Sequence, residues 1–190
     1  ERILYSTNRM RELINDLLAF SRTNIVDRKY ENTDLNKILE SVTDALRENI
    51  KEKNAVITTE LHGNIRIIPF LFVQLIENLV NNALKFCKED VPPHIEIKSR
   101  IVSGSELQNE KLLTTGNYCH ITFQDNGIGF DPEHSEKIFG VFQRLHGREI
   151  YDGTGIGLAI VKKIVENHNG IITATAAPMK GATFNIYIPE

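Results

Sequence analysis

Residues 118–130 read YCHITFQDNGIGF, an alternating segment that is followed at once by an acid and two glycines. The alternation over 118–125 predicts a β-strand, which leads directly into DNGIGF (125–130). Glycines two residues apart are typical of a tight turn, and also of a loop whose backbone must approach a ligand closely. Six residues leave both interpretations open, so the rest of the chain has to decide between them.

The bulk composition is that of an ordinary globular protein. The chain has 190 residues, of which 41% are hydrophobic and 25% are charged, and a formal net charge of −3. This balance gives no basic field for nucleic acid. Cys87 and Cys119 lie far apart, so neither a disulfide scaffold nor a zinc site is indicated. We find no signal peptide and no apolar run of roughly 18–20 residues that could span a membrane. Because the chain does not begin with Met, we expect a piece of a longer protein.

Hydrophobic periodicity predicts a mixed β-sheet covered by helices on one face. The expected helices cover 33–53, 69–87 and 157–168, a short one covers 135–139, and the expected strands cover 55–61, 65–68, 94–102, 118–125, 170–177 and 182–189. Asp34 or Thr33 is a candidate cap for the first helix, and Pro69 suits the first turn of the second. The polar stretches 103–117 and 140–153 are expected to be loops. This order of elements predicts an α+β fold, a two-layer sandwich of sheet and helices.

The first 23 residues predict a further helix. Ile3, Met10 and Leu17 recur every seven residues, while charged side chains occupy the opposite face. This pattern favours one half of a coiled-coil-like helical hairpin that needs partner helices, although a helix packed on its own domain remains an alternative. Residues 24–32 are polar and aperiodic, which is typical of a linker. We therefore expect a partial hairpin at 1–23, a linker at 24–32 and one domain at 33–190.

Three polar side chains share one face of the otherwise apolar helix 69–87. Asn78, Asn82 and Lys85 are spaced by four and three residues, so they lie on the same side. One interpretation is that they only form hydrogen bonds with neighbouring loops. The other is a phosphate and magnesium site, because an asparagine carbonyl is an oxygen ligand for Mg²⁺ and a lysine is a point charge for phosphate.

A second glycine cluster, GTGIGL (153–158), opens directly into a helix. Backbone N–H groups at a helix start bind anions well, although turns alone explain many such clusters. No strand directly precedes the cluster, so it is not a dinucleotide-binding fingerprint, and no G-x-x-x-x-G-K-S/T loop occurs in the chain.

Five motifs in this order resemble the ATP-binding domain of sensor histidine kinases, in the superfamily shared with gyrase, a heat-shock chaperone and a mismatch-repair ATPase. They are ENLVNNALKF (77–86), DNGIGF (125–130), IFGVFQR (138–144), GTGIGLAI (153–160) and GATFNIYIP (181–189). The resemblance spans residues 33–190. In addition, RMRELINDLLAFSR (9–22) resembles the end of the second helix of the dimerisation and histidine phosphotransfer hairpin.

The resemblance implies that ATP and Mg²⁺ are bound. For the nucleoside, Asp125 would accept a hydrogen bond from the adenine amino group, Gly127 and Gly129 would let the backbone approach the base, and Thr183 would lie beside Asp125. For the phosphates, Asn82 would coordinate Mg²⁺ with support from Asn78, and Lys85 would contact phosphate. The residues that would complete the phosphate cradle and its lid are Phe139, Phe142, Arg144, Gly153, Thr154, Gly155, Gly157 and Leu158, with Arg144 reaching the terminal phosphate.

The resemblance also favours phosphoryl transfer over hydrolysis. ATPases of the superfamily carry a glutamate four residues before the metal-binding asparagine, where this chain has Asn78. Glu77 is adjacent but lies about 100° around the helix. None of the six histidines lies in a motif like His-Glu-(Leu/Ile)-Arg-(Ser/Thr)-Pro, so we expect the phosphoacceptor on an upstream helix and no autophosphorylation of this chain.

The implied function is that of a transferase in a two-component phosphorelay. The implied partners are a second copy, which would dimerise through the hairpin, and the receiver domain of a response regulator. No nucleic acid partner is implied. We expect a cytoplasmic location, either free or as the cytoplasmic part of a membrane-anchored receptor. The alternatives are an ATPase of the superfamily that uses nucleotide to drive dimerisation, and a degenerate module that serves only for docking or dimerisation. A metal or redox protein has no ligand cluster to support it.

Overall fold

The structure is a computed structural model that describes residues 29–107, 115–145 and 153–190, together with residues 7, 10, 11, 13–15, 17 and 18. These eight N-terminal positions are helical, as predicted. The rest of the segment 1–28, residues 108–114 of the loop 103–117 and residues 146–152 of the loop 140–153 lie outside the described residues. No helix within the described residues has the length and apolar character that crossing a bilayer requires.

The described chain alternates strands and helices. The strands are β1 (Glu31–Asp34), β2 (Val56–Glu60), β3 (Asn64–Ile67), β4 (His94–Ser103), β5 (Asn117–Asp125), β6 (Ile171–Ala176) and β7 (Ala182–Pro189). The α-helices are α2 (Leu35–Ala45), α3 (Arg47–Glu52), α4 (Pro69–Lys85) and α5 (Gly157–Asn167). Short 3₁₀ turns are formed by η1 (Gly104–Glu106), η2 (Pro132–His134) and η3 (Lys137–Phe139).

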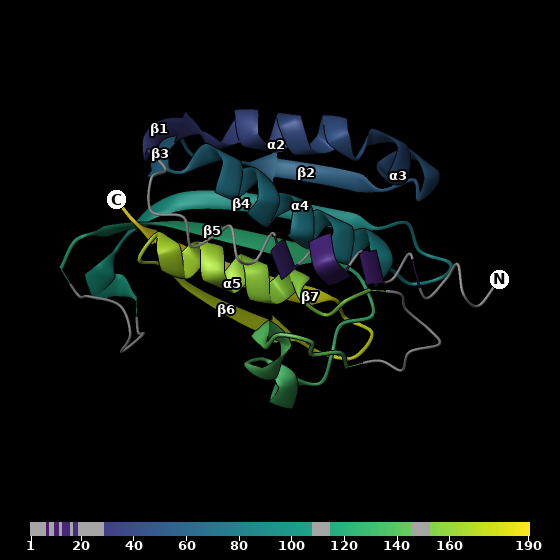
Figure 1. Cartoon of the computed structure of the whole chain (residues 1–190). Helices are drawn as coiled ribbons and strands as arrows, with labels where there is room; N and C mark the ends of the chain where they lie inside the picture. Colours follow the sequence, from purple (N-terminus) through teal and green to yellow (C-terminus); the bar gives the residue numbers. More distant parts are fainter. Residues whose placement is uncertain are drawn as a thin grey trace.

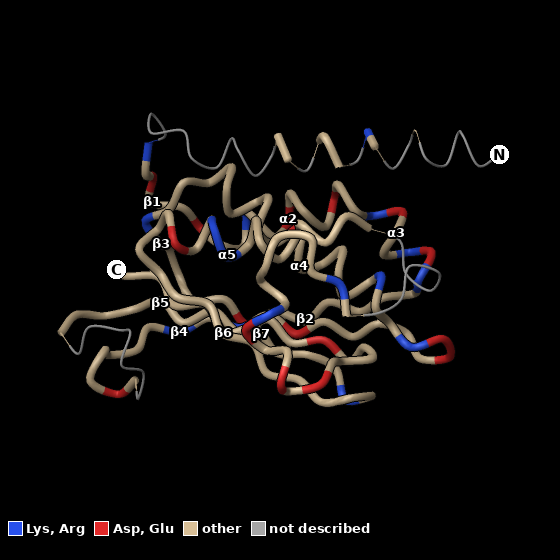
Figure 2. The backbone as a smooth tube through the Cα atoms, turned by 60° about the horizontal axis from the view of Figure 1, so that its bottom comes forward, with Lys and Arg blue, Asp and Glu red and all other residues tan. Residues whose placement is uncertain are grey.

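Five strands form the main sheet in the order β2-β4-β5-β7-β6. β2 runs parallel to β4, whereas the other neighbours are antiparallel, so the sheet is mixed as predicted. Figure 1 shows α2, α4 and α5 together on one side of this sheet. The predicted α+β sandwich of two layers is therefore confirmed. Acidic and basic residues are interspersed along the described chain (Figure 2), in keeping with its small net charge.

Local signals set the helix boundaries. The side chain of Asp34 accepts a hydrogen bond from the backbone N–H of Asn36 at 2.9 Å, so it caps the start of α2. Pro69 occupies the first turn of α4, where its missing N–H has no partner to lose. α4 ends at Lys85, two residues before the predicted end at Cys87.

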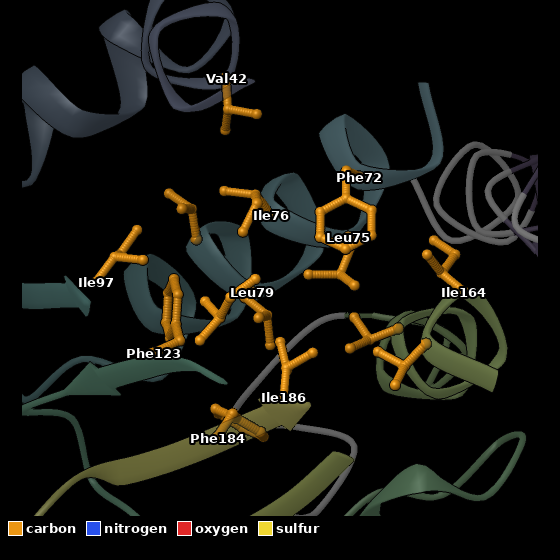
Figure 3. Close-up of a cluster of buried hydrophobic side chains, with 14 of the residues drawn as sticks. Val42, Phe72, Leu75, Ile76, Leu79, Ile97, Phe123, Ile164, Phe184 and Ile186 are labelled. Atoms are coloured by element: carbon orange, nitrogen blue, oxygen red, sulfur yellow. The ribbon is translucent and has the colours of Figure 1, made fainter. Parts of the chain in front are cut away.

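Helix α4 forms the centre of the hydrophobic core. Leu75 and Leu79 are fully buried and point toward Phe123 and Ile186 of the sheet, while Ile164 approaches from α5 (Figure 3). Burial of each such side chain stabilises the fold by about 1.5–3 kcal/mol. This packing fixes the helix that carries Asn78, Asn82 and Lys85 directly over the centre of the sheet.

Part of the predicted linker is a strand. Glu31 pairs with Ile67 and Asn32 with Arg66, so β1 and β3 form a separate two-stranded sheet. The prediction of an irregular linker up to residue 32 was wrong because ENTD has no alternating pattern, and only its pairing with β3 makes it a strand.

The described N-terminal residues have two kinds of environment. Leu13 packs against the main core, as expected for a helix on its own domain. Met10 and Ile14 are 62% and 53% exposed, as expected for a helix that needs a further partner. Both interpretations of this helix therefore keep support.

Candidate functional site

Asp125 ends β5 with one carboxylate oxygen fixed by the fold. Its Oδ1 accepts hydrogen bonds from the backbone N–H groups of Gly127 at 2.8 Å and Ala182 at 3.3 Å. Among the described residues, no group hydrogen-bonds to Oδ2. Burial raises the pKa of Asp125, although the two N–H donors act in the opposite direction. The site therefore holds a half-buried carboxyl group with one oxygen available to a donor.

The first glycine pair is required by close packing. A Cβ on Gly127 would lie 2.5 Å from the carbonyl oxygen of Phe86, and a Cβ on Gly129 would collide with the carbonyl oxygen of Ala177. Gly129 also has a φ of +63°, which favours glycine. The loop is fastened by Asn126, a residue that the sequence analysis did not single out. Its Oδ1 accepts from the N–H of His94 at 2.8 Å, and its Nδ2 donates to the carbonyl oxygen of Pro92 at 3.0 Å.

The polar face of α4 meets the second glycine cluster. Asn78 donates from Nδ2 to the carbonyl oxygen of Gln74 at 2.7 Å, which leaves its Oδ1 facing Gly157. Asn82 is half-buried, and its side chain makes no hydrogen bond within the described part of the chain. The Lys85 ammonium lies 4.7 Å from the centroid of the Phe86 ring. These three side chains therefore share one face, as predicted.

Each glycine of the second cluster contacts a different segment. A Cβ on Gly153 would collide with the Lys85 ammonium, and a Cβ on Gly157 would lie 2.8 Å from Oδ1 of Asn78. A Cβ on Gly155 would lie 2.8 Å from the carbonyl oxygen of Gln143. The cluster thus brings two segments to the start of α5. One is the end of α4, which lies more than sixty residues earlier in the sequence, and the other is the segment around residues 142–144.

Two further residues of the cluster have structural contacts. Thr154 accepts a hydrogen bond at Oγ1 from the N–H of Ile156 at 3.3 Å, one residue before α5 begins. Leu158 is partly buried and packs against the main core. Thr154 therefore orders the turn, and Leu158 anchors the first turn of the helix.

The two phenylalanines expected at the base of a lid have different environments. Phe139 is buried, and its ring centroid lies 6.4 Å from that of Phe184. Phe142 has a φ of +63° and a side chain that is 60% exposed, so the expected packing does not hold for it. Arg144 is half-buried, and its Cγ lies 3.2 Å from where a Cβ on Gly155 would be. Arg144 is therefore next to the second glycine cluster.

The expectation that the side chain of Thr183 lies beside Asp125 does not hold. Thr183 pairs with Gln124, and side chains of successive strand residues point to opposite faces. Ala182 and Phe184 are buried on the helix side of β7, so Thr183 lies on the other face. Ala182, which the sequence analysis missed, contacts Asp125 through its backbone N–H. Counting the strand alternation back from Phe184, which is buried, would have indicated Ala182 as the residue on the helix side of β7.

The arrangement suits a ligand with an amino-bearing ring at one end and anionic groups at the other. Asp125 supplies an acceptor, whereas Lys85 and the glycine-rich backbone supply charge and N–H donors. No group of three His, Cys, Asp or Glu side chains that could hold a metal ion occurs among the described residues. A metal held by Asn82 would therefore keep most of its ligands from water and from the bound anion, as Mg²⁺ commonly does.

Comparison with known proteins identifies the family. The sequence profile described as histidine kinase-, DNA gyrase B-, and HSP90-like ATPase matches residues 67–190. The chain belongs to this family. Cyanobacterial phytochrome A of Nostoc sp. is 39% identical over 181 residues, which cover 95% of the chain and 22% of that protein. The sensor-like histidine kinase SenX3 of Mycobacterium tuberculosis is 30% identical over 196 residues, which cover 100% of the chain and 44% of that protein.

Solved structures of histidine kinases have the same fold as this ATPase-family domain. Full-length ShkA in complex with AMPPNP superposes with a TM-score of 0.76 at 22% identity, covering 97% of the chain and 36% of ShkA. The Acinetobacter baumannii histidine kinase AdeS superposes with a TM-score of 0.73 at 20% identity, covering 99% of the chain and 82% of AdeS. The chain spans less than half the length of phytochrome A and of SenX3.

Proposed function

We propose that this chain is the ATP-binding catalytic domain of a two-component sensor histidine kinase. It transfers the γ-phosphoryl group of ATP to a histidine on an upstream helix, for relay to an aspartate of a response regulator. The observation that carries this proposal is the meeting of Lys85 and Asn78 with Gly153 and Gly157, which places a cation and an amide against a glycine-lined backbone. Membership of the family supports the proposal.

The adenine ring is bound at the first glycine pair. Oδ2 of Asp125 accepts a hydrogen bond from the exocyclic amino group, while Oδ1 is held by Gly127 and Ala182. A carboxylate with one oxygen fixed by backbone donors distinguishes an amino group from a carbonyl group at this position, because it can only accept. Gly127 and Gly129 leave room for the carbonyl groups of Phe86 and Ala177, so the loop that follows Asp125 can pack closely beside the base.

The phosphates are bound between α4 and the second glycine cluster. Lys85 neutralises phosphate charge, and the backbone N–H groups of residues 153–157 donate to phosphate oxygens. Asn82 holds Mg²⁺ through its side-chain carbonyl oxygen, which fits the donor set because this amide has no partner among the described residues. A metal ion held there would supply positive charge against the negative charge that develops on the phosphates. Arg144, beside Gly155, approaches the terminal phosphate.

The domain itself positions the nucleotide and supplies no base. The acceptor imidazole nitrogen forms a bond to the γ-phosphorus, the bond to the bridging oxygen breaks, and ADP leaves with that electron pair. Asn78 cannot accept a proton from water, and its Nδ2 is already bound to Gln74. The site therefore favours transfer over hydrolysis, which argues against an ATPase that drives dimerisation.

Two partners and a location complete the proposal. The full-length protein is a homodimer through the helical hairpin to which residues 1–23 belong. The phosphohistidine is read by the receiver domain of a response regulator. Phosphorylation of the histidine and relay to the response regulator take place in the cytoplasm, because that is where ATP is available to such a domain.

Labelling with ATP that carries ³²P in the γ position tests the proposal. A longer version of the chain, extended to include the preceding helix, is expected to acquire label that is stable in alkali and labile in acid. The chain of residues 1–190 alone is expected to acquire none. In the longer version Asn82→Ala abolishes labelling, whereas the exposed Asn81→Ala serves as the matched control and retains it. Rapid release of inorganic phosphate by the short chain would contradict transfer.

A further inference from the structure

His168 is a buried histidine that the nucleotide site does not use. It follows the last turn of α5 and is only 3% exposed. Its Nδ1 lies 2.7 Å from the carbonyl oxygen of Ile164, and its Nε2 lies 3.0 Å from the backbone nitrogen of Ile68. A carbonyl oxygen only accepts and an amide N–H only donates, so the proton must be on Nδ1 and the lone pair on Nε2. The two contacts therefore require a neutral imidazole in one tautomer.

The same imidazole contacts the segment that enters the domain. The Tyr30 ring packs edge-on against His168 at 5.3 Å, and Phe72 does so from α4 at 5.0 Å. The Tyr30 hydroxyl donates to the carbonyl oxygen of Asn167 at 2.7 Å. Arg66 lies over the Tyr30 ring at 6.0 Å. Tyr30 immediately precedes β1, so these contacts fasten the entering segment to the end of α5.

This position is the far end of both helices that form the nucleotide site. α4 begins next to Ile68 and carries Asn82 and Lys85 near its other end, about 21 and about 25 Å along the helix from Ile68. α5 begins with Gly157 at the site and ends beside His168. The two helices pack against each other. A shift of one helix end at His168 is therefore carried to the site, because packed helices move as stiff units.

We propose that Tyr30 and His168 form a clasp that couples the entering segment, residues 29–34, to the spacing between α4 and α5 at the nucleotide site. His168 is a positioning residue in this clasp, and it acts only as the neutral Nδ1–H tautomer. Movement of the upstream helices reaches the site through this contact, and nucleotide binding in turn tightens the clasp. The reciprocal effect follows from linkage between two sites on one molecule.

Protonation of His168 opens the clasp. A second ring proton would sit on Nε2 and face the N–H of Ile68, so that two donors would oppose each other. Around the ring, Arg66 contributes positive charge behind Tyr30, and Glu166 pairs with Lys162 on the exposed side of α5. No ion pair to the imidazole is formed within the described residues. Burial lowers the pKa of His168. The clasp therefore contributes its full stability above about pH 6.5 and loses it as the pH falls below that value.

Hydrogen–deuterium exchange of the peptide covering residues 29–36 tests the clasp without any ligand. Protection factors are compared between pH 7.5 and pH 5.5 in the wild-type chain, in His168→Gln and in the exposed control His62→Gln. Protection is expected to fall by up to about tenfold at pH 5.5 in the wild type and the control, because that pH lies about one unit below the ordinary histidine pKa of about 6.5. His168→Gln should show reduced protection at both pH values and no step between them. An equal pH step in His168→Gln would overturn the clasp.

A second arm measures the coupling, and this arm rests on the proposed function. Saturating AMPPNP is expected to increase protection of 29–36 in the wild type, together with the peptides covering 125–130 and 153–158. Tyr30→Phe removes only one hydroxyl group, so it should fold and yet show at least a threefold smaller increase at 29–36. Protection of the glycine peptides with no change at 29–36 would overturn the coupling alone. Protection at neither place would overturn the nucleotide site. The pH dependence of exchange at residues 29–36 would then still decide whether the clasp exists.

Discussion

Replacing Asp125 by Asn separates nucleotide recognition from folding. Asn keeps an acceptor oxygen that can receive the N–H groups of Gly127 and Ala182, at 2.8 and 3.3 Å in the wild type. The other carboxylate oxygen becomes an NH₂ group. That group is a donor, so it faces the adenine amino group with two donors and no acceptor. The substitution therefore removes the recognition of adenine and leaves the fixed end of the side chain intact.

The expected loss of ATP affinity follows from one charge-assisted hydrogen bond. Such a bond contributes about 1.5–3 kcal/mol, which corresponds to a weakening of about 10- to 150-fold. The free energy of unfolding is expected to stay the same or to rise. Burial raises the folded-state pKa of Asp125 above its ordinary value of 3.8, so the stability that its protonated form provides is lost as the pH rises through that folded pKa. Asn removes the charge that causes this loss.

Calorimetric titration with ATP at pH 7.5 measures the affinity, and thermal melting without ligand measures the stability. Asp125→Asn is expected to weaken ATP binding with an unchanged or higher melting temperature. Because protonation also removes the acceptor, wild-type affinity should fall as the pH drops toward the raised pKa of Asp125, whereas the residual affinity of the variant should lack this step. Wild-type affinity in Asp125→Asn would refute the assignment of adenine to this carboxylate.

The remaining predictions concern the metal ligand, the glycine cradle and the core. Asn82→Ala should remove the gain in ATP affinity that Mg²⁺ gives, without changing affinity in EDTA; the exposed Asn81→Ala is the control, and loss of the gain in both would argue against a direct ligand. Gly157→Ala should lower ATP affinity about tenfold with helix content unchanged by circular dichroism, because its Cβ would lie 2.8 Å from Oδ1 of Asn78; unchanged affinity would show that the cradle tolerates a methyl group. Leu79→Ala should destabilise the domain by about 3–5 kcal/mol in urea unfolding, since Leu79 is fully buried; a loss below about 1 kcal/mol would contradict its central place in the core.

Much of the fold could be predicted because its elements carry strong local signals. The apolar helix after Pro69 and the alternating strand before Asp125 lie within two residues of their predicted ends. β1 could not be predicted, because Glu31–Asp34 is polar and becomes a strand only through its partner β3. Tertiary pairing overrides local preference in such a segment.

The site was predictable as a set of motifs, but less so as individual contacts. Spacing placed Asn78, Asn82 and Lys85 on one helix face, which the structure shows. The face of the sheet on which the Thr183 side chain lies depends on the register of β7, because a shift of one residue moves every side chain to the opposite face. The role of His168 could not be inferred from sequence, because its partners lie near residues 30 and 68 and only the fold brings them together.

Titration of the ¹⁵N-labelled chain with AMPPNP and Mg²⁺, followed by amide NMR shifts, is the direct test of a nucleotide site between α4 and the glycine clusters. We expect saturable shifts that are largest at the backbone amides of Gly127, Gly129, Gly153 and Gly155 and at the side-chain amide of Asn82. Amides on the open face of the sheet, such as that of Thr173, should hardly move. Shifts confined to that face, or no saturable shifts at millimolar nucleotide, would contradict a nucleotide site between α4 and the two glycine clusters.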